Sequence, residues 1–97
     1  MLLGDLIARF DDPVIAAETL MSLEDLALTN RVREASEQQG LTSGEFAGMA
    51  VRVFADTASD EEWVTTIGQM ARTPQPGLEL LRRSLHWMLT PHPAGCA

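Results

Sequence analysis

The apolar positions of this 97-residue chain repeat at the spacing of an α-helix over most of its length. The clearest case is the segment 44–58, where apolar residues occupy the i, i+3, i+4, i+7 and i+8 positions and others widen that stripe on its flank. The stripe consists of Phe46, Met49, Ala50, Val53 and Phe54, and Ala47, Val51, Ala55 and Ala58 lie beside it. The positions left for water are Glu45, Gly48, Arg52 and Asp56. We therefore expect this helix to lie in the middle of the domain.

Start and stop signals predict helices on both sides of this segment. A short helix is expected over 2–10, and a second begins at Pro13, because Asp12 is a suitable N-cap and proline suits the first helical position. A third runs over about 23–39 and ends at Gly40. The stretch Ser22–Asp25 resembles a capping box, which predicts a kink or a new helix start there.

The segments after Gly40 carry similar signals. Thr42 or Ser43 is expected to cap the helix at 44–58, and Ser59 with Glu62 forms a capping box for the next one. The buried face of that next helix is predicted to be Trp63, Val64, Ile67, Met70 and Ala71. The last helix, over about 77–89, has a stripe of Leu78, Leu81, Leu85, Met88 and Leu89, widened by Leu80 and Trp87.

These patterns predict an all-α fold, a small single-domain helical bundle of about five helices. The domain is expected to span 1–90, and 91–97 to form a flexible, irregular C-terminal tail. Composition agrees, because the apolar residues are mainly Leu, Ala, Met and Val, a mixture that favours helices over sheets.

Charge and cysteine content narrow the classes of function. The net charge is −7 and no lysine is present, so the chain repels nucleic-acid phosphates and anionic lipids and lacks any lysine nucleophile. The single cysteine, Cys96, cannot form an internal disulfide. The first ten residues lack the basic region of a signal peptide, and no apolar run is long enough to span a bilayer. We expect a cytoplasmic protein that is not bound in a membrane.

Candidate catalytic and metal-binding groups are sparse. His86, His92 and Cys96 are the residues with soft metal ligands, and their spacing matches no zinc signature. The paired acids at 11–12 and 60–62 lie at helix starts, where acids serve as caps. We therefore predict that the chain is not an enzyme, and that it has no catalytic residue, cofactor or metal.

The segment 28–54 resembles the paired helices of ribbon-helix-helix repressors. The resemblance rests on Leu28, Val32, Gly40, Glu45, Phe46, Ala50, Val51, Arg52 and Phe54. It implies a small DNA-binding transcription regulator or antitoxin-like protein. Members of that family read bases from a short basic strand before the first helix, whereas the sequence here is "AAETLMSLED", which is acidic. This departure disfavours nucleic-acid binding, which we keep as an alternative.

The apolar surface exceeds what one small domain is expected to cover. The helices at 44–58 and 77–89 are apolar on more than one face, which predicts a homodimer that shares apolar surface. The candidate interface residues are Trp63, Met70, Leu80, Trp87, Arg82 and Arg83. Arg72, Arg82 and Arg83 also form a basic cluster, which either pairs within the chain or meets the acidic N-terminal half of another copy or a protein partner.

The leading hypothesis is therefore a non-catalytic cytosolic interaction or regulatory domain that self-associates through surplus apolar helix faces. Besides the DNA-binding alternative, a third hypothesis is an accessory subunit of an enzyme. That hypothesis predicts a concave pocket lined by carboxylates.

Overall fold

The computed structural model describes residues 3–90, which form six α-helices and contain no strand. The helices are α1 (Leu3–Arg9), α2 (Pro13–Ser22), α3 (Leu26–Gln39), α4 (Ser43–Thr57), α5 (Asp60–Met70) and α6 (Pro76–Leu89). The predicted all-α fold is confirmed, with six helices in place of about five. The tail predicted at 91–97 lies outside the described residues.

Local capping interactions set most of these boundaries. The Asp12 carboxylate accepts a hydrogen bond from the Val14 N–H at 2.9 Å, as expected for the residue before Pro13. At the start of α4, Thr42 is the N-cap, and Gly40 ends α3 in the left-handed conformation with φ 70°. Both of these boundaries agree with the sequence analysis.

The start of α3 differs from the expectation. A new helix does begin there, but its N-cap is Asp25, whose carboxylate accepts from the Leu28 N–H at 3.0 Å. Ser22 is the last residue of α2 and donates its hydroxyl to the Glu18 carbonyl oxygen, so it cannot cap the next helix. Between the two helices Glu24 takes a positive φ of 54°, which turns the chain. The capping residue is therefore the acid next to the helix, not the serine three residues earlier.

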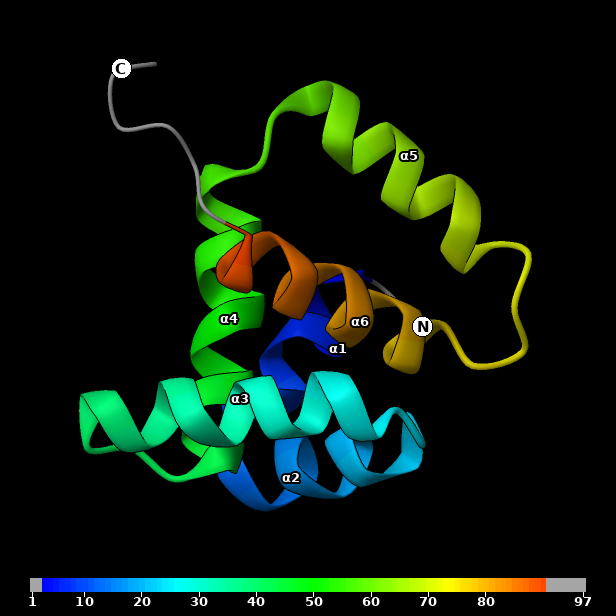
Figure 1. The fold of residues 1–97 in the computed structure, drawn as a ribbon. Coiled ribbons are helices and arrows are strands. Elements are labelled where there is room, and N and C mark those ends of the chain that lie inside the picture. Colours follow the sequence, from blue (N-terminus) through cyan, green and yellow to red (C-terminus); the bar gives the residue numbers. More distant parts are fainter. Residues whose placement is uncertain (1–2, 91–97) are drawn as a thin grey trace.

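Helix α4 lies at the centre of the fold, as predicted, and contacts α1, α2, α3 and α6 (Figure 1). Its buried side is rotated slightly from the predicted stripe, since Ala47 and Val51 are fully enclosed while Met49 and Val53 are half-buried. Phe54 has no exposed surface, and full burial of such a side chain contributes roughly 1.5–3 kcal/mol relative to leaving it in water. The core therefore surrounds α4.

Two glycines allow α4 to pack closely against the chain that enters α2. A Cβ on Gly44 would lie 2.3 Å from the Pro13 carbonyl oxygen, and one on Gly48 would lie 2.4 Å from the Phe10 carbonyl oxygen. The expectation that Gly48 faces water is therefore wrong. It is half-buried, because the backbone of Phe10 packs directly over it.

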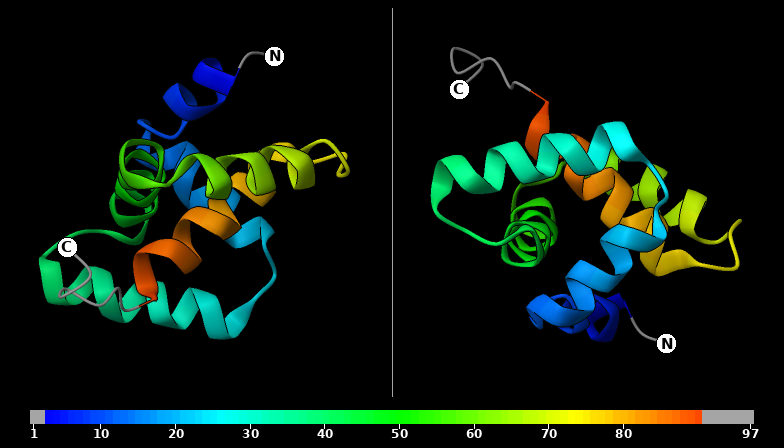
Figure 2. Two further views of the ribbon diagram at one scale, coloured as in Figure 1. Left: turned by 90° about the horizontal axis from the view of Figure 1, so that it is seen from above. Right: turned by 60° about the horizontal axis from the view of Figure 1, so that its bottom comes forward.

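Helix α5 is set apart from the helices of the N-terminal half. Figure 1 shows it at the opposite end of the molecule from α2 and α3, and Figure 2 shows it beside α6 from two further directions. The loop that follows it, residues 71–75, returns the chain to α6. With α6 covering one side of α5, most of its circumference is left facing solvent.

Candidate interaction surface

The inward side of α5 is more polar than the sequence analysis predicted. Thr66 is fully buried, and Trp63 and Met70 are half-buried. Val64 and Ile67, however, are 72% and 49% exposed. The predicted buried face is therefore correct for Trp63 and Met70 and wrong for Val64, Ile67 and Ala71, all three of which are exposed.

A single arginine of α6 explains why the polar side of α5 faces α6 and the side with Val64 and Ile67 does not. The Arg83 guanidinium donates to the Thr66 hydroxyl at 3.0 Å, to the Gln69 side-chain oxygen at 3.1 Å and to the Glu62 carboxylate at 2.6 Å. These three acceptors lie on one side of α5 at successive turns, so the arginine fork fixes that side toward α6. We call this arrangement the Arg83 clasp.

The Arg83 clasp also changes the role of Glu62. The Ser59 hydroxyl accepts from the Glu62 N–H at 3.2 Å, which is one half of the predicted capping box. The Glu62 carboxylate, which would complete the box, is bound to Arg83 instead. The helix start was therefore predicted correctly, while the partner of the carboxylate was not.

Aromatic side chains complete the attachment of α5. The ring of Phe54 in α4 lies 5.2 Å from the Trp63 ring and 5.9 Å from the Trp87 ring, measured between centroids. Pairs at such distances and tilted angles contribute about 0.5–1.5 kcal/mol beyond the burial of their surface. The indole N–H of Trp87 donates to the Thr57 hydroxyl at 3.2 Å. Trp63 and Trp87 thus pack within the chain around Phe54.

The residues predicted to form an interface are brought together, but mostly inside the chain. Leu80 has no exposed surface and belongs to the core, so it presents nothing to a second molecule. Trp63, Met70 and Trp87 pack against that core as half-buried residues. Arg83 is occupied by the clasp. These five residues join α5 and α6 to the rest of the fold.

The three arginines of the predicted basic cluster differ in their contacts within the chain. Arg83 pairs with Glu62, and Arg82 lies 3.9 Å from an Asp25 carboxylate oxygen. Both of these pairs lie within the chain, one of the two possibilities considered from the sequence. Arg72 is exposed and makes no ion pair with any residue between 3 and 90. It is therefore the member of the cluster that is available to a partner.

The outward side of α5 carries a continuous apolar stripe. Its residues follow the i, i+3, i+4, i+7 spacing of one helix face, and all are exposed. They are Val64, Ile67, Gly68 and the C-cap residue Ala71, which continues the helical conformation, and we call them the α5 stripe. Glu61 and Arg72, both exposed, lie at the two ends of the stripe, Glu61 in the first turn of α5 and Arg72 in the turn after its C-cap. The sequence analysis assigned Val64, Ile67 and Ala71 to the core, and the signal it missed was the row of polar residues at 62, 66 and 69.

Other exposed apolar residues lie on a different part of the surface. Val14 and Met21 are 63% and 77% exposed on α2, and Leu26 is 81% exposed at the start of α3. Acidic residues surround them, among them Glu18 and Glu24. Isolated apolar side chains of this kind are common on soluble proteins. Among residues 3–90, the α5 stripe differs from these positions in having an acidic residue at one end and a basic residue at the other.

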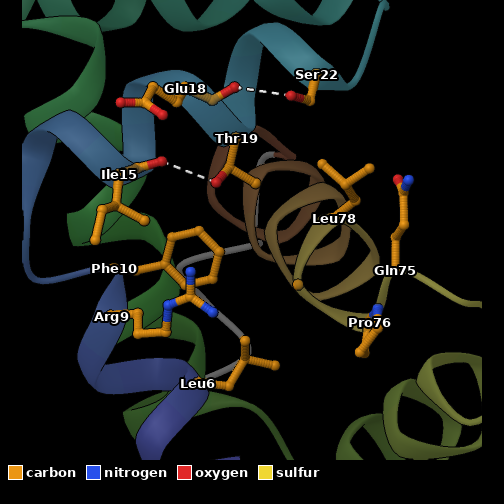
Figure 3. A pocket seen from close by; sticks show the side chains of 11 residues that line it. Leu6, Arg9, Phe10, Ile15, Glu18, Thr19, Ser22, Gln75, Pro76 and Leu78 are labelled. Atoms are coloured by element: carbon orange, nitrogen blue, oxygen red, sulfur yellow. Dashed lines mark hydrogen bonds between the residues drawn. The ribbon is translucent and has the colours of Figure 1, made fainter.

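A cavity of about 460 Å³ lies between α1, α2 and the start of α6 (Figure 3). Its apolar lining includes Phe10 and Leu78, and Arg9 and Glu18 are exposed beside it. The hydroxyl of Thr19, also in the lining, donates to the backbone of its own helix at 2.8 Å. The cavity is a broad, open depression whose lining includes one carboxylate, that of Glu18.

The segment 28–54, which resembles the paired helices of ribbon-helix-helix repressors, lies in helices α3 and α4. The segment that precedes it, where those repressors have their strand, is helix α2. Arg52, the basic residue on the outer side of α4, is hydrogen-bonded to Asp11, and this contact raises its pKa further above the ordinary value. The arginine is therefore engaged by an acid of the same chain.

The described part of the chain was also searched for metal and membrane sites. Residues 3–90 contain no group of three His, Cys, Asp or Glu residues arranged to hold a metal ion. His86 is exposed, whereas His92 and Cys96 lie outside the described residues. Within the same range, every helix is too short or too polar to cross a lipid bilayer.

Comparisons of the chain with protein families, with curated proteins and with solved structures find no match.

Proposed function

We propose that this protein is a non-catalytic interaction domain that self-associates through the α5 stripe. The supporting observation is the exposure of Val64 and Ile67 side by side on one face of a helix that is otherwise well anchored. Apolar surface of this kind gains free energy when a partner removes it from water. The Arg83 clasp holds the helix in place, so little ordering is needed when a partner binds.

The proposal includes a cytoplasmic location. Its support is the single cysteine, which excludes the internal disulfides typical of small extracellular domains. In the cytoplasm the domain would catalyse no reaction. When two copies associate, they would bring together the proteins bound to each copy.

Sedimentation velocity over about 1 µM to 1 mM tests self-association, a range chosen because a small interface supports micromolar or weaker binding. We expect a reversible shift from monomer toward dimer as the concentration rises. The double substitution Val64→Asp and Ile67→Asp should leave the protein monomeric with its helical circular dichroism unchanged, because both side chains face solvent.

The double substitution Val14→Asp and Met21→Asp is the matched control, because it places the same two charges on comparably exposed apolar residues of α2. It should leave the sedimentation of the protein unchanged. Wild-type protein that stays monomeric over the whole range would contradict self-association. A loss of association in this control, with association retained in the α5 variant, would assign self-association to another surface.

The two alternatives receive less support from the structure. DNA binding would need a basic surface, whereas Arg52 is paired with Asp11 and the acidic side chains of Glu45 and Asp56 lie exposed on the same helix.

An accessory role in an enzyme would need a carboxylate-lined pocket. The cavity between α1, α2 and α6 has Glu18 as its one carboxylate. A smaller cavity beside α6 is lined by Glu62 and Glu79 but also by Arg82 and Arg83, which offset their charge.

A further inference from the structure

We infer that two copies of the protein pair through α5 in antiparallel orientation, with a two-fold axis close to Gly68. This inference rests on the proposed self-association and adds its geometry. It follows from the order of apolar, acidic and basic positions along α5 and from the fact that all of them face solvent.

The apolar positions fit a two-fold axis across the helix. Val64 and Ala71 are separated by seven residues, about 10 Å along the helix, and Ile67 and Gly68 lie halfway between them. In an antiparallel pair, Val64 of one copy meets the partner's Ala71, and the central residues meet each other. The larger side chain at one end of the stripe thus contacts the smaller one at the other end.

The charges fit the same axis. Glu61 lies in the first turn of α5 and Arg72 follows its C-cap, and the midpoint of these two positions lies within one residue of the midpoint of Val64 and Ala71. In an antiparallel helix pair, the start of each helix lies beside the end of the other. Glu61 of one copy therefore lies opposite the partner's Arg72, and the symmetry creates this ion pair twice.

The parallel arrangement lacks this complementarity. It would bring the acidic first turns of the two helices, with Asp60 and Glu61, to the same end of the pair, and would leave Arg72 of each copy at the far end from the partner's Glu61. Like charges held close together across an interface are unfavourable, which disfavours that orientation. The acidic surroundings of Met21 and Leu26 disfavour two-fold pairing through α2 and α3 for the same reason.

Cysteine cross-linking tests the geometry. In a Cys96→Ser background, Gly68→Cys should form a disulfide with itself, since the position lies near the axis. Val64→Cys and Ala71→Cys should each cross-link poorly alone, because the equivalent residues are about 10 Å apart along the helices. A mixture of these two variants should give the mixed disulfide. Cross-linking of Val64→Cys with itself as fast as Gly68→Cys would overturn the antiparallel pairing.

Charge reversal provides a second test that does not depend on cysteine. Glu61→Arg or Arg72→Glu alone should weaken dimerisation, each on the order of tenfold, because two attractive contacts become repulsive. An equimolar mixture of the two variants should restore dimerisation, since each arginine then faces a glutamate. The matched controls are Glu37→Arg and Arg33→Glu on the exposed side of α3, which change the net charge by the same amounts and should leave dimerisation unchanged at about 0.15 M salt, where long-range repulsion is screened.

The outcomes separate the two proposals. A wild-type protein that sediments as a monomer at all concentrations would overturn self-association and this geometry together. A dimer that neither cross-links through Gly68→Cys nor responds to Glu61→Arg would overturn the antiparallel α5 pairing alone.

Discussion

At the scale of single residues, Gly44 determines how closely α4 can approach α2. A Cβ at this position would lie 2.3 Å from the Pro13 carbonyl oxygen and 3.2 Å from the Ala17 Cβ. The obstacle is backbone, which cannot move aside as a flexible side chain can. We therefore expect Gly44→Ala to lower the free energy of unfolding by about 1–3 kcal/mol, as measured by urea denaturation. The control is Gly4→Ala, where nothing lies within 4 Å of the new Cβ.

If Gly44→Ala were as stable as the wild-type protein, the close contact between α2 and α4 would be contradicted. The expected loss is opposite to the usual effect of this substitution within a helix, where alanine is favoured over glycine by roughly 0.5–1 kcal/mol. The sign of the change therefore distinguishes packing from helix propensity.

The start of α4 provides a prediction of pH dependence. Glu45 accepts a hydrogen bond from the Thr42 backbone N–H at 2.9 Å, and bonding to the backbone and then to the hydroxyl of Thr42 lowers the pKa of Glu45 below its ordinary value of 4.5. The folded-state pKa is thus lower than the unfolded-state pKa. Ionised Glu45 therefore stabilises the fold above the unfolded-state pKa, and this stabilisation is lost as the pH falls through the folded-state pKa.

We expect Glu45→Gln to be less stable than the wild-type protein near neutral pH, with a difference in urea midpoint that shrinks as the pH falls below 4.5. Thr42→Ala serves as the comparison, since it removes the N-cap at every pH and should cost about 1 kcal/mol throughout. A stability difference for Glu45→Gln that stays constant with pH would contradict the role of the ionised carboxylate.

At the scale of the helices, the Arg83 clasp determines how firmly α5 is attached. Arg83→Leu removes three hydrogen bonds to α5 and leaves Glu62 and Thr66 without that partner. Because the contacts are partly exposed to solvent, we expect a loss of about 1–2 kcal/mol. Hydrogen exchange should become faster in α5 than in α4. A lysine should not restore the protection, since its single ammonium group cannot span the three acceptors.

Arg82→Leu is the matched control in the neighbouring position. Its contact with Asp25 spans 3.9 Å between partly exposed side chains, so its removal should have little effect on stability or exchange. Equal acceleration of exchange in α5 for both variants would contradict a specific role for Arg83.

Helix α5 shows what could and could not be predicted from the sequence. Periodicity and caps located α4, α5 and α6, because these signals depend on residues close together in the chain. The inward side of α5 depends instead on Arg83, which is distant in sequence and selects the polar row containing Thr66. Hydrophobicity alone assigned Val64 and Ile67 to the core. Only the arrangement of α5 against α6 reveals that they are exposed.

At the scale of the whole molecule, the net charge of −7 opposes the pairing of two copies. Most of it lies in residues 1–45, which hold nine Asp or Glu residues and three Arg residues. The repulsion between two copies therefore acts over distances comparable to the size of the domain. The distance over which this repulsion acts depends on the salt concentration, with a screening length of about 30 Å at 0.01 M and about 8 Å at 0.15 M. The Glu61–Arg72 contacts between copies are also screened, but exposed ion pairs contribute little at any salt concentration.

We therefore expect dimerisation to become stronger as the salt concentration rises from about 0.01 M to 0.15 M, because the loss of long-range repulsion outweighs the loss of two exposed ion pairs. Sedimentation equilibrium in sodium chloride measures the change. The dimer of Glu37→Arg should respond less, since each copy then carries a net charge of −5 while the α5 stripe is unchanged. Weaker dimerisation at higher salt would mean that the flanking ion pairs, and not the apolar stripe, dominate the interface.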